Sequence, residues 1–194
     1  MPIKVTINND MISNKYFINN LLYVTDTVRQ LVRESGFPGM KVLEFAFDSR
    51  DSGSANDYLP HNYVENCVAY TGTHDNETVA GWMDSITEEE LEMARRYLYD
   101  MHTPKEELYK PFIAAAMRSN AKYCIVPMQD WLGLDNSCRM NKPSTIGANW
   151  RWRVTKQQLT KELDMLDMTK CYGRMNWEAY HLLKKQEENK NEAV

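Results

Sequence analysis

Three short apolar runs punctuate the chain and predict β-strands. They are Met40–Phe47, Cys67–Gly72 and Tyr123–Met128, and each is flanked by segments that contain glycine, proline or several polar residues. Apolar runs of this length without strict alternation are typical of strands that are buried on both faces. The pattern therefore predicts three buried strands.

Helical patterns lie between these runs. Residues from Thr25 to Gly36 place apolar side chains at helical spacing, with a threonine that can cap the first turn and a glycine that can close the last. A longer pattern opens at Thr87, where three glutamates suit the positive end of the helix dipole, breaks at Pro104 and resumes over 106–118. Strands that alternate with helices are typical of parallel βα units, so the predicted fold class is α/β.

Polar clusters follow each predicted strand, in the sequences FDSRD, THDNE and QDWLG. In parallel α/β folds, binding and catalytic groups collect at the C-terminal ends of the strands. This edge of the sheet is therefore the expected working face, although the pattern alone does not name a reaction.

The two ends of the chain differ from its middle. Residues 1–23 are rich in asparagine, lack periodicity and are expected to form an irregular lead-in. After residue 155, two amphipathic stretches, 156–168 and 177–185, lead into a charged run, and residues 178–194 are expected to be a solvated helical or disordered tail. No linker or repeat divides the part between them.

Composition narrows the classes of function. The 194 residues carry a net charge of −4, which argues against a nucleic-acid partner, because neutralising phosphates requires a basic face. No run approaches the roughly 18 apolar residues of a membrane span, and the N-terminus lacks the apolar segment of a signal peptide.

The four cysteines are widely spaced and form no Cys-x-x-Cys pair, which favours free thiols over a disulfide or a metal site. Cys67 and Cys124 lie in apolar runs, where cysteine acts as a small hydrophobic side chain. The expected compartment is the reducing cytoplasm. The cysteines are Cys67, Cys124, Cys138 and Cys171.

Several polar side chains at the strand ends are candidates for chemistry, each with a structural alternative. His74 and Asp75 could bind sugar hydroxyls, because a carboxylate accepts hydrogen bonds from two of them, or could cap the following helix. Asp130 could bind a ligand or cap a helix. A buried Glu44 would need a partner or a raised pKa.

Aromatic and basic side chains crowd the loops. Aromatic rings stack on the apolar faces of sugars, but the same rings also suit ordinary packing. A basic and amide cluster after the third strand is better explained by ion pairs than by a phosphate site, since no glycine-rich phosphate-binding motif is present. The rings are Tyr58, Tyr63, Trp82, Trp131, Trp150 and Trp152, and the cluster is Arg139, Asn141, Arg151 and Arg153.

Six motifs in fixed order resemble the C-terminal portion of the 4-α-glucanotransferases (amylomaltases) of glycoside hydrolase family 77. The resemblance covers about residues 24–153 and is extended to 177. The motifs are GFPGMKVLEFAF, YLPHNY, YTGTHDNET, VPMQDWLGL, RMNKPST and NWRWR, which begin at residues 36, 58, 70, 126, 139 and 149.

The resemblance implies a (β/α)₈ TIM-type barrel of which residues 24–177 would form about three βα units, an incomplete part as it stands. It implies a retaining transfer of α-1,4-glucan segments between maltooligosaccharides, with no metal or organic cofactor. Asp75 matches the carboxylate that holds hydroxyls of the reacting sugar, His74 binds the same sugar, and Asn141 lines the cleft.

Departures from the family pattern limit this expectation. The family nucleophile motif, of the type R-I-D-H-F, is absent, and an ungapped extension places Asn19 and Asn20 where the family has the Glu and Asp of A-E-D-L-G. Asp135 replaces a glycine and Cys138 an alanine ahead of R-M-N, and the loss of a glycine there can disturb the loop that carries Asn141. Since retaining chemistry needs two flanking carboxyl groups, the chain alone is not expected to turn over substrate.

Three hypotheses follow from these observations. The first is a fragment of a 4-α-glucanotransferase with Asp75 as its one matched catalytic carboxylate. The second is a non-catalytic glucan-binding or interaction module. The third is one half of a split enzyme that is completed by a separately encoded N-terminal barrel portion.

Overall fold

A computed structural model describes residues 26–48, 56–161 and 163–192, and its chain divides into two compact units, 1–39 and 40–194. In the first unit, helix α2 spans Asp26–Ser35 and is followed by Gly36 with φ +73°. The predicted helix with its closing glycine is therefore confirmed. The expected cap, Thr25, lies outside the described residues.

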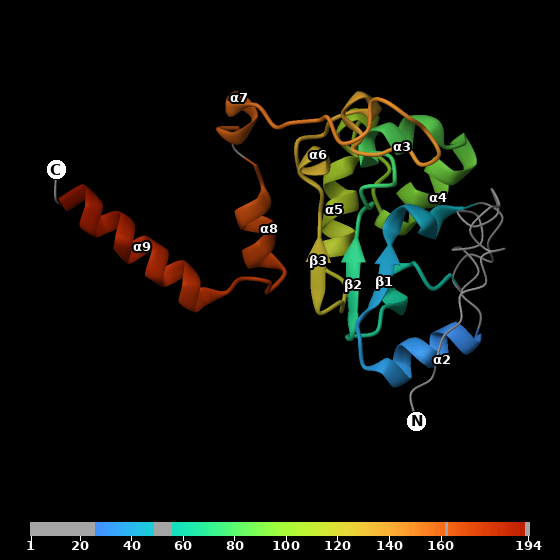
Figure 1. Ribbon diagram of the computed structural model, residues 1–194, viewed down its shortest axis with the longest axis horizontal. Helices are drawn as coiled ribbons and strands as arrows, with labels where there is room; N and C mark the ends of the chain where they lie inside the picture. Colours follow the sequence, from blue (N-terminus) through green and yellow to red (C-terminus); the bar gives the residue numbers. More distant parts are fainter. Residues whose placement is uncertain (1–25, 49–55, 162, 193–194) are drawn as a thin grey trace. The chain divides into compact units, whose positions relative to one another are not determined.

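The second unit is built on a three-stranded sheet. β1 spans Gly39–Val42, β2 Cys67–Tyr70 and β3 Tyr123–Ile125, and the strand order is β1-β2-β3. β2 and β3 are parallel, with Val68 opposite Tyr123, and the three arrows run side by side in one direction (Figure 1). The prediction of parallel strands that alternate with helices is therefore confirmed for this three-stranded sheet.

The first predicted strand is much shorter than its apolar run. β1 ends at Val42, and Leu43–Phe47 form the 3₁₀ helix η2. In this turn Leu43, Ala46 and Phe47 share one face and are buried, which is helical rather than alternating spacing. The Asn56 side chain donates hydrogen bonds to the carbonyls of Phe45 and Ala46, and these contacts hold the turn.

β3 also departs from the expectation of strands buried on both faces. Tyr123 and Ile125 are half exposed, whereas Cys67 and Ala69 in β2 are fully buried. β3 is one of the two edge strands of the described sheet, so one of its sides has no neighbouring strand there.

The core lies between the sheet and a layer of helices. α3 spans Val79–Ser85, α4 Glu88–Leu98 and α5 Tyr109–Met117, with the short turn η5 at Lys105–Glu107 after Pro104. α5 contacts β2, α3, α4 and the short α6, Met128–Trp131. Three aromatic rings, Phe47, Trp82 and Phe112, pack at the centre of this core.

The helix that opens at Thr87 does so as predicted. The Thr87 hydroxyl accepts a hydrogen bond from the Glu90 N–H, and the Glu90 carboxylate accepts one from the Thr87 N–H, which is a capping box. The break at Pro104 is also confirmed.

Four short elements complete the second unit before its final helix. They are η4 at Pro60–Asn62, η6 at Asn136–Cys138, α7 at Lys156–Leu159 and α8 at Met165–Cys171. The single stretch expected over 156–168 is thus split between α7 and α8. Arg174, just after α8, donates hydrogen bonds to three backbone carbonyls, those of Met117, Ser119 and Ala121.

The last helix, α9, spans Trp177–Glu192, and Trp177, Leu182 and Leu183 on it are half exposed or more. The expectation of a solvated tail over residues 178–194 stays a prediction. Among the described residues, no helix is both long and apolar enough to cross a bilayer.

Candidate functional site

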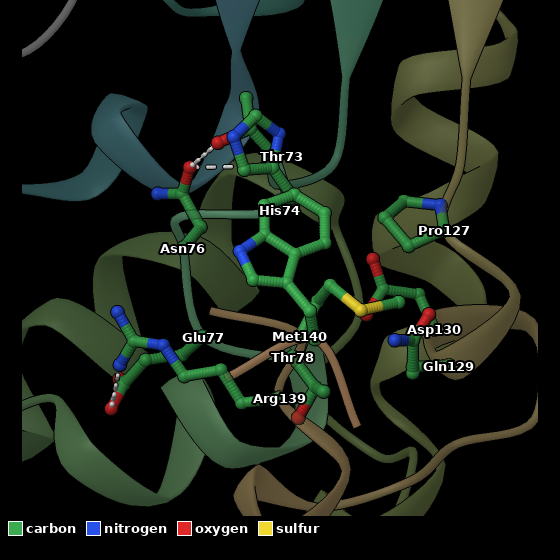
Figure 2. A pocket seen from close by; sticks show the side chains of 11 residues that line it. Thr73, His74, Asn76, Glu77, Thr78, Pro127, Gln129, Asp130, Arg139 and Met140 are labelled. Carbon is green, nitrogen blue, oxygen red and sulfur yellow. Dashed lines mark hydrogen bonds and ion pairs between the residues drawn. The ribbon is translucent and has the colours of Figure 1, made fainter. Parts of the chain in front are cut away.

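The segments after β2 and β3 meet at one end of the sheet. Thr73, His74 and Asn76 follow β2, the segment from Pro127 to Asp130 follows β3, and Arg139 belongs to a third segment (Figure 2). These are the C-terminal ends of parallel strands, as the polar clusters in the sequence predicted.

The turn after β2 is closed by its own side chains. Asn76 Oδ1 accepts hydrogen bonds from the Thr73 N–H at 3.0 Å and from the Thr73 hydroxyl at 2.7 Å. The first helix after the turn, α3, is capped by Thr78, whose hydroxyl accepts from the Gly81 N–H. Asp75 therefore does not cap this helix, and its side chain is half exposed.

The three residues singled out by the family resemblance come together. Asn141 Nδ2 donates to Asp75 Oδ1 at 2.5 Å, and His74 Nε2 lies 3.4 Å from the same oxygen. The Asn141 N–H also donates to the His74 carbonyl at 3.0 Å. Arg139 fastens the two segments further, because its Nη2 donates to the Asp75 carbonyl at 2.7 Å.

A pocket of about 180 Å³ adjoins this cluster. Its lining includes Thr73, His74, Gln129, Asp130, Arg139 and Trp150. Asp75 and Asn141 are not among the lining residues, but His74, whose Nε2 lies against the Asp75 carboxylate, is one of them.

Two buried carboxyl groups lie beneath the turn. Glu44 is 5% exposed, and its Oε1 has no hydrogen-bond partner among the described residues. Burial raises the pKa of Glu44 well above its ordinary value, and the nearby Asp130 and Glu77 raise it further, while Asn76 and Arg139 lower it. The sequence could mark Glu44 as a candidate but could not say which face it would occupy.

Asp130 acts as a helix cap across the fold. Its Oδ1 accepts from the N–H of Val79, the first residue of α3, at 2.9 Å, and its Oδ2 accepts from the Thr71 hydroxyl at 2.6 Å. Burial raises the pKa of Asp130 to about 6, although both hydrogen bonds lower it. The capping alternative is thus confirmed, for a helix far from Asp130 in sequence.

The replaced glycine before R-M-N does not disturb the loop. Asp135 adopts φ −77°, which suits any residue, and its side chain accepts from the Ser137 N–H at the start of η6. Asn136 then donates to Glu77 and accepts from the Thr78 N–H, which ties the loop to the start of α3. Asp135 is thus accommodated in the loop without a left-handed backbone.

The expected ion pair is present at Arg139 in the basic cluster, and the cysteines are free thiols that differ in exposure. Arg139 pairs with Glu77 at 3.6 Å, while Arg153 donates to backbone carbonyls. All four cysteines are free, and the buried Cys67 behaves as a small apolar side chain. In the described part of the chain, no group of three or more His, Cys, Asp or Glu residues could hold a metal ion.

The aromatic residues divide into two groups. Trp82 and Trp131 are buried in the core, as the packing alternative predicted, whereas Trp150 is 54% exposed and lines the pocket. The Trp150 ring lies 5.0 Å from the His74 ring, centroid to centroid. The sequence carries no sign that would separate Trp150 from the other tryptophans.

The sequence matches one family model, described as 4-alpha-glucanotransferase, over residues 13–160. A 4-alpha-glucanotransferase of Clostridium butyricum is 43% identical over 80% of this chain and 31% of its own length. The chloroplastic/amyloplastic 4-alpha-glucanotransferase of Solanum tuberosum is 41% identical over 78% of this chain and 26% of its own length.

A solved structure supports the same relationship. Amylomaltase from Streptococcus agalactiae, in complex with acarbose, aligns with a TM-score of 0.73 and 36% identity over 81% of this chain and 31% of that protein. The chain thus spans less than a third of the length of these relatives. On the family model, the relatives and the fold together, the chain belongs to the 4-alpha-glucanotransferase family, glycoside hydrolase family 77.

Proposed function

We propose that the chain supplies the sugar-holding carboxylate and part of the glucan cleft of a 4-alpha-glucanotransferase, which moves α-1,4-glucan segments between maltooligosaccharides. Asp75 is the catalytic residue in this proposal, and His74 and Asn141 bind the same sugar. The observation that carries it is the convergence of Asn141 and His74 on one oxygen of Asp75, in a chain of this family.

The geometry suits a carboxylate that binds hydroxyl groups. Both contacts fall on Asp75 Oδ1, so among the described residues Oδ2 remains the oxygen that can accept from a ligand. A carboxylate accepts hydrogen bonds from two hydroxyls, and the Asn141 amide fixes its orientation before a sugar arrives. Asp75 thereby stabilises a distorted sugar in the transition state.

Turnover needs two further carboxyl groups. A retaining transfer requires a nucleophile and an acid/base on opposite sides of the scissile bond, and the two family motifs that carry them are absent from this sequence. We therefore assign them to a second polypeptide segment, the N-terminal barrel portion. The chain forms about three βα units of the (β/α)₈ barrel, and the half-exposed edge strand β3 is consistent with a neighbour there.

The complementation test uses maltotriose disproportionation, followed as glucose release. The chain is assayed alone and mixed with the N-terminal remainder of the Streptococcus agalactiae amylomaltase, each with wild-type and Asp75→Asn forms. We expect glucose only from the mixture that contains the wild-type chain. Glucose from the chain alone that persists in Asp75→Asn would contradict the proposal, because the assigned carboxylate would then be dispensable.

A non-catalytic glucan-binding module remains the alternative that this assay separates. The exposed Asp75 carboxylate beside an open pocket is the observation that favours it. Saturable binding of maltotriose without glucose release from any mixture would support the module over the split enzyme.

The proposed compartment is the reducing cytoplasm. Its support is the four free thiols, and burial raises the pKa of the Cys124 thiol to about 11, which keeps it in the unreactive protonated form. Resistance of the folded chain to a thiol reductant, with no change in its unfolding midpoint, is the expected result.

A further inference from the structure

Trp150 adopts a backbone conformation that bulky residues rarely take. Its φ is +63°, in the left-handed region, where the Cβ of an L-residue crowds the backbone. Strained residues of this kind persist only where the surroundings hold them in place, and they gather at functional sites.

Two hydrogen bonds to Trp150 and two to its neighbour Asn149 hold the backbone in that conformation. Its N–H donates to the Met140 carbonyl at 2.7 Å, and its carbonyl accepts from Arg153 Nη1 at 2.9 Å. The preceding residue, Asn149, closes the loop by accepting from the Lys142 N–H and donating to the Lys142 carbonyl. The backbone of Trp150 is therefore fixed on both sides, next to the segment that carries Asn141.

The strained backbone directs the indole to the pocket rather than into the core. Trp82 and Trp131, which have packing roles, are each 9% exposed, but Trp150 is 54% exposed. Its ring lies against the His74 imidazole at a tilt of 39° and lines the pocket. The loop thus presents an indole that is supported on one side and accessible on the other.

The surroundings of this indole fit a sugar ring. Sugars combine an apolar C–H face, which an aromatic ring covers, with hydroxyls that need polar partners. Polar side chains also line the pocket, among them Gln129 and Arg139, and His74 in the lining contacts the Asp75 carboxylate.

We propose that Trp150 is a saccharide-stacking residue, whose indole covers the apolar face of a glucosyl ring bound beside His74 and Asp75. The inference rests on the proposed function, since it names a contact residue of the same site. It also explains the strain: the left-handed backbone at Trp150 is retained because it aims the indole at the bound sugar.

The test is calorimetric titration of the full chain with acarbose, for wild type, Trp150→Phe, Trp150→Ala, Trp150→Gly and Asp75→Asn. Trp152→Ala, in the same loop, is the matched control. We expect the dissociation constant to rise about tenfold in Trp150→Ala and Trp150→Gly, and to change less than threefold in Trp150→Phe and Trp152→Ala.

Two further readouts separate stacking from a structural role. Because glycine adopts the left-handed conformation freely, Trp150→Gly should weaken binding without lowering the unfolding midpoint. We expect acarbose to change the tryptophan fluorescence of the wild type. The same titration should leave the fluorescence of Trp150→Phe unchanged, although this variant still binds.

The outcomes are distinct for the two proposals. If wild type and all Trp150 variants bind alike while Asp75→Asn fails to bind, the stacking role is overturned and the proposed function stands. A loss of affinity in Trp150→Gly that is matched by a lower unfolding midpoint also overturns it. If the wild type does not bind acarbose, the stacking role is overturned, whereas the proposed function is decided by the glucose released in the complementation mixture.

Discussion

Replacing Asp130 by asparagine should remove the pH dependence of stability that this buried carboxyl imposes. The side chain is 1% exposed and joins Thr71 to the first N–H of α3. Asparagine has nearly the same shape and keeps an oxygen for the Val79 N–H, while its amide can donate to the Thr71 hydroxyl oxygen. The substitution therefore removes the charge with little change in packing.

The magnitude follows from the raised pKa of Asp130. Below pH 3.8 the carboxyl is protonated in both the folded and the unfolded chain and adds no pH dependence. Between 3.8 and about 6 the unfolded chain releases the proton first, so the free energy of unfolding falls as the pH rises. The full loss is about 3 kcal/mol, of which about 2 kcal/mol falls between pH 4 and pH 7.

Urea unfolding at pH 4 and pH 7, followed by tryptophan fluorescence, measures the effect. The free energy of unfolding of Asp130→Asn, relative to wild type, should rise by about 2 kcal/mol from pH 4 to pH 7. Glu44 adds to this in the same direction, because the Asp130 charge raises its pKa in the wild type. If the difference in free energy of unfolding between Asp130→Asn and wild type is the same at both pH values, Asp130 is not a carboxyl whose charged form is destabilised by burial.

Asp135→Asn is the control, with the opposite sign. Hydrogen bonds from Ser137 lower the pKa of Asp135, so its stabilising effect is present above its ordinary pKa and is lost as the pH falls. Relative to wild type, Asp135→Asn should change little in stability between pH 4 and pH 7 and should gain stability as the pH falls below 3.8. An equal response of both variants between pH 4 and pH 7 would show that the effect is not specific to burial.

Substitutions at three further positions test a close approach beneath the site, a helix cap and an arginine that bridges three carbonyls. Gly72→Ala should lower the free energy of unfolding in urea by about 1–3 kcal/mol, because the Glu44 carboxyl occupies the space of the new Cβ. An unchanged free energy of unfolding would contradict this close approach. Thr87→Ala should lower the free energy of unfolding by about 1 kcal/mol, whereas Thr87→Ser, which keeps the hydroxyl, should lower it much less. Equal losses in the two variants would argue against the capping box. Arg174→Lys should lower the unfolding midpoint, because an ammonium cannot reproduce the planar fork that reaches three carbonyls; an unchanged midpoint would show that the fork adds little.

Local signals made part of the fold predictable. The start of α4 depends on Thr87 and Glu90, three residues apart, and the end of α2 depends on Gly36, so both could be found in the sequence alone. The break at Pro104 is local for the same reason. Elements whose conformation is set by near neighbours were the ones predicted correctly.

Long-range contacts decided the parts that were missed. The run after Val42 is apolar enough for a strand, but Asn56 binds its carbonyls and the turn η2 places Leu43 and Phe47 in the core together. Short apolar runs do not separate strand from helix, so only the tertiary partner could settle this. Likewise, Asp130 caps a helix 51 positions away, which no local pattern records.

The candidate site was predictable through the family resemblance more than through the residues themselves. The pattern put His74 and Asp75 at a strand end, but their meeting with Asn141, 66 positions from Asp75, depends on the whole fold. Trp150 was one of several loop aromatics, and its left-handed backbone has no counterpart in the sequence. The strain and the exposure that single it out are properties of the folded loop.

The central claim is that Asp75, held by Asn141 and His74, binds glucan, and amide NMR spectra of the chain during a maltotriose titration test it most directly. We expect saturable shifts of the His74, Asp75 and Asn141 resonances in the wild type, and their loss in Asp75→Asn. Shifts that are the same in both proteins, or that leave these three residues unaffected, would contradict the account.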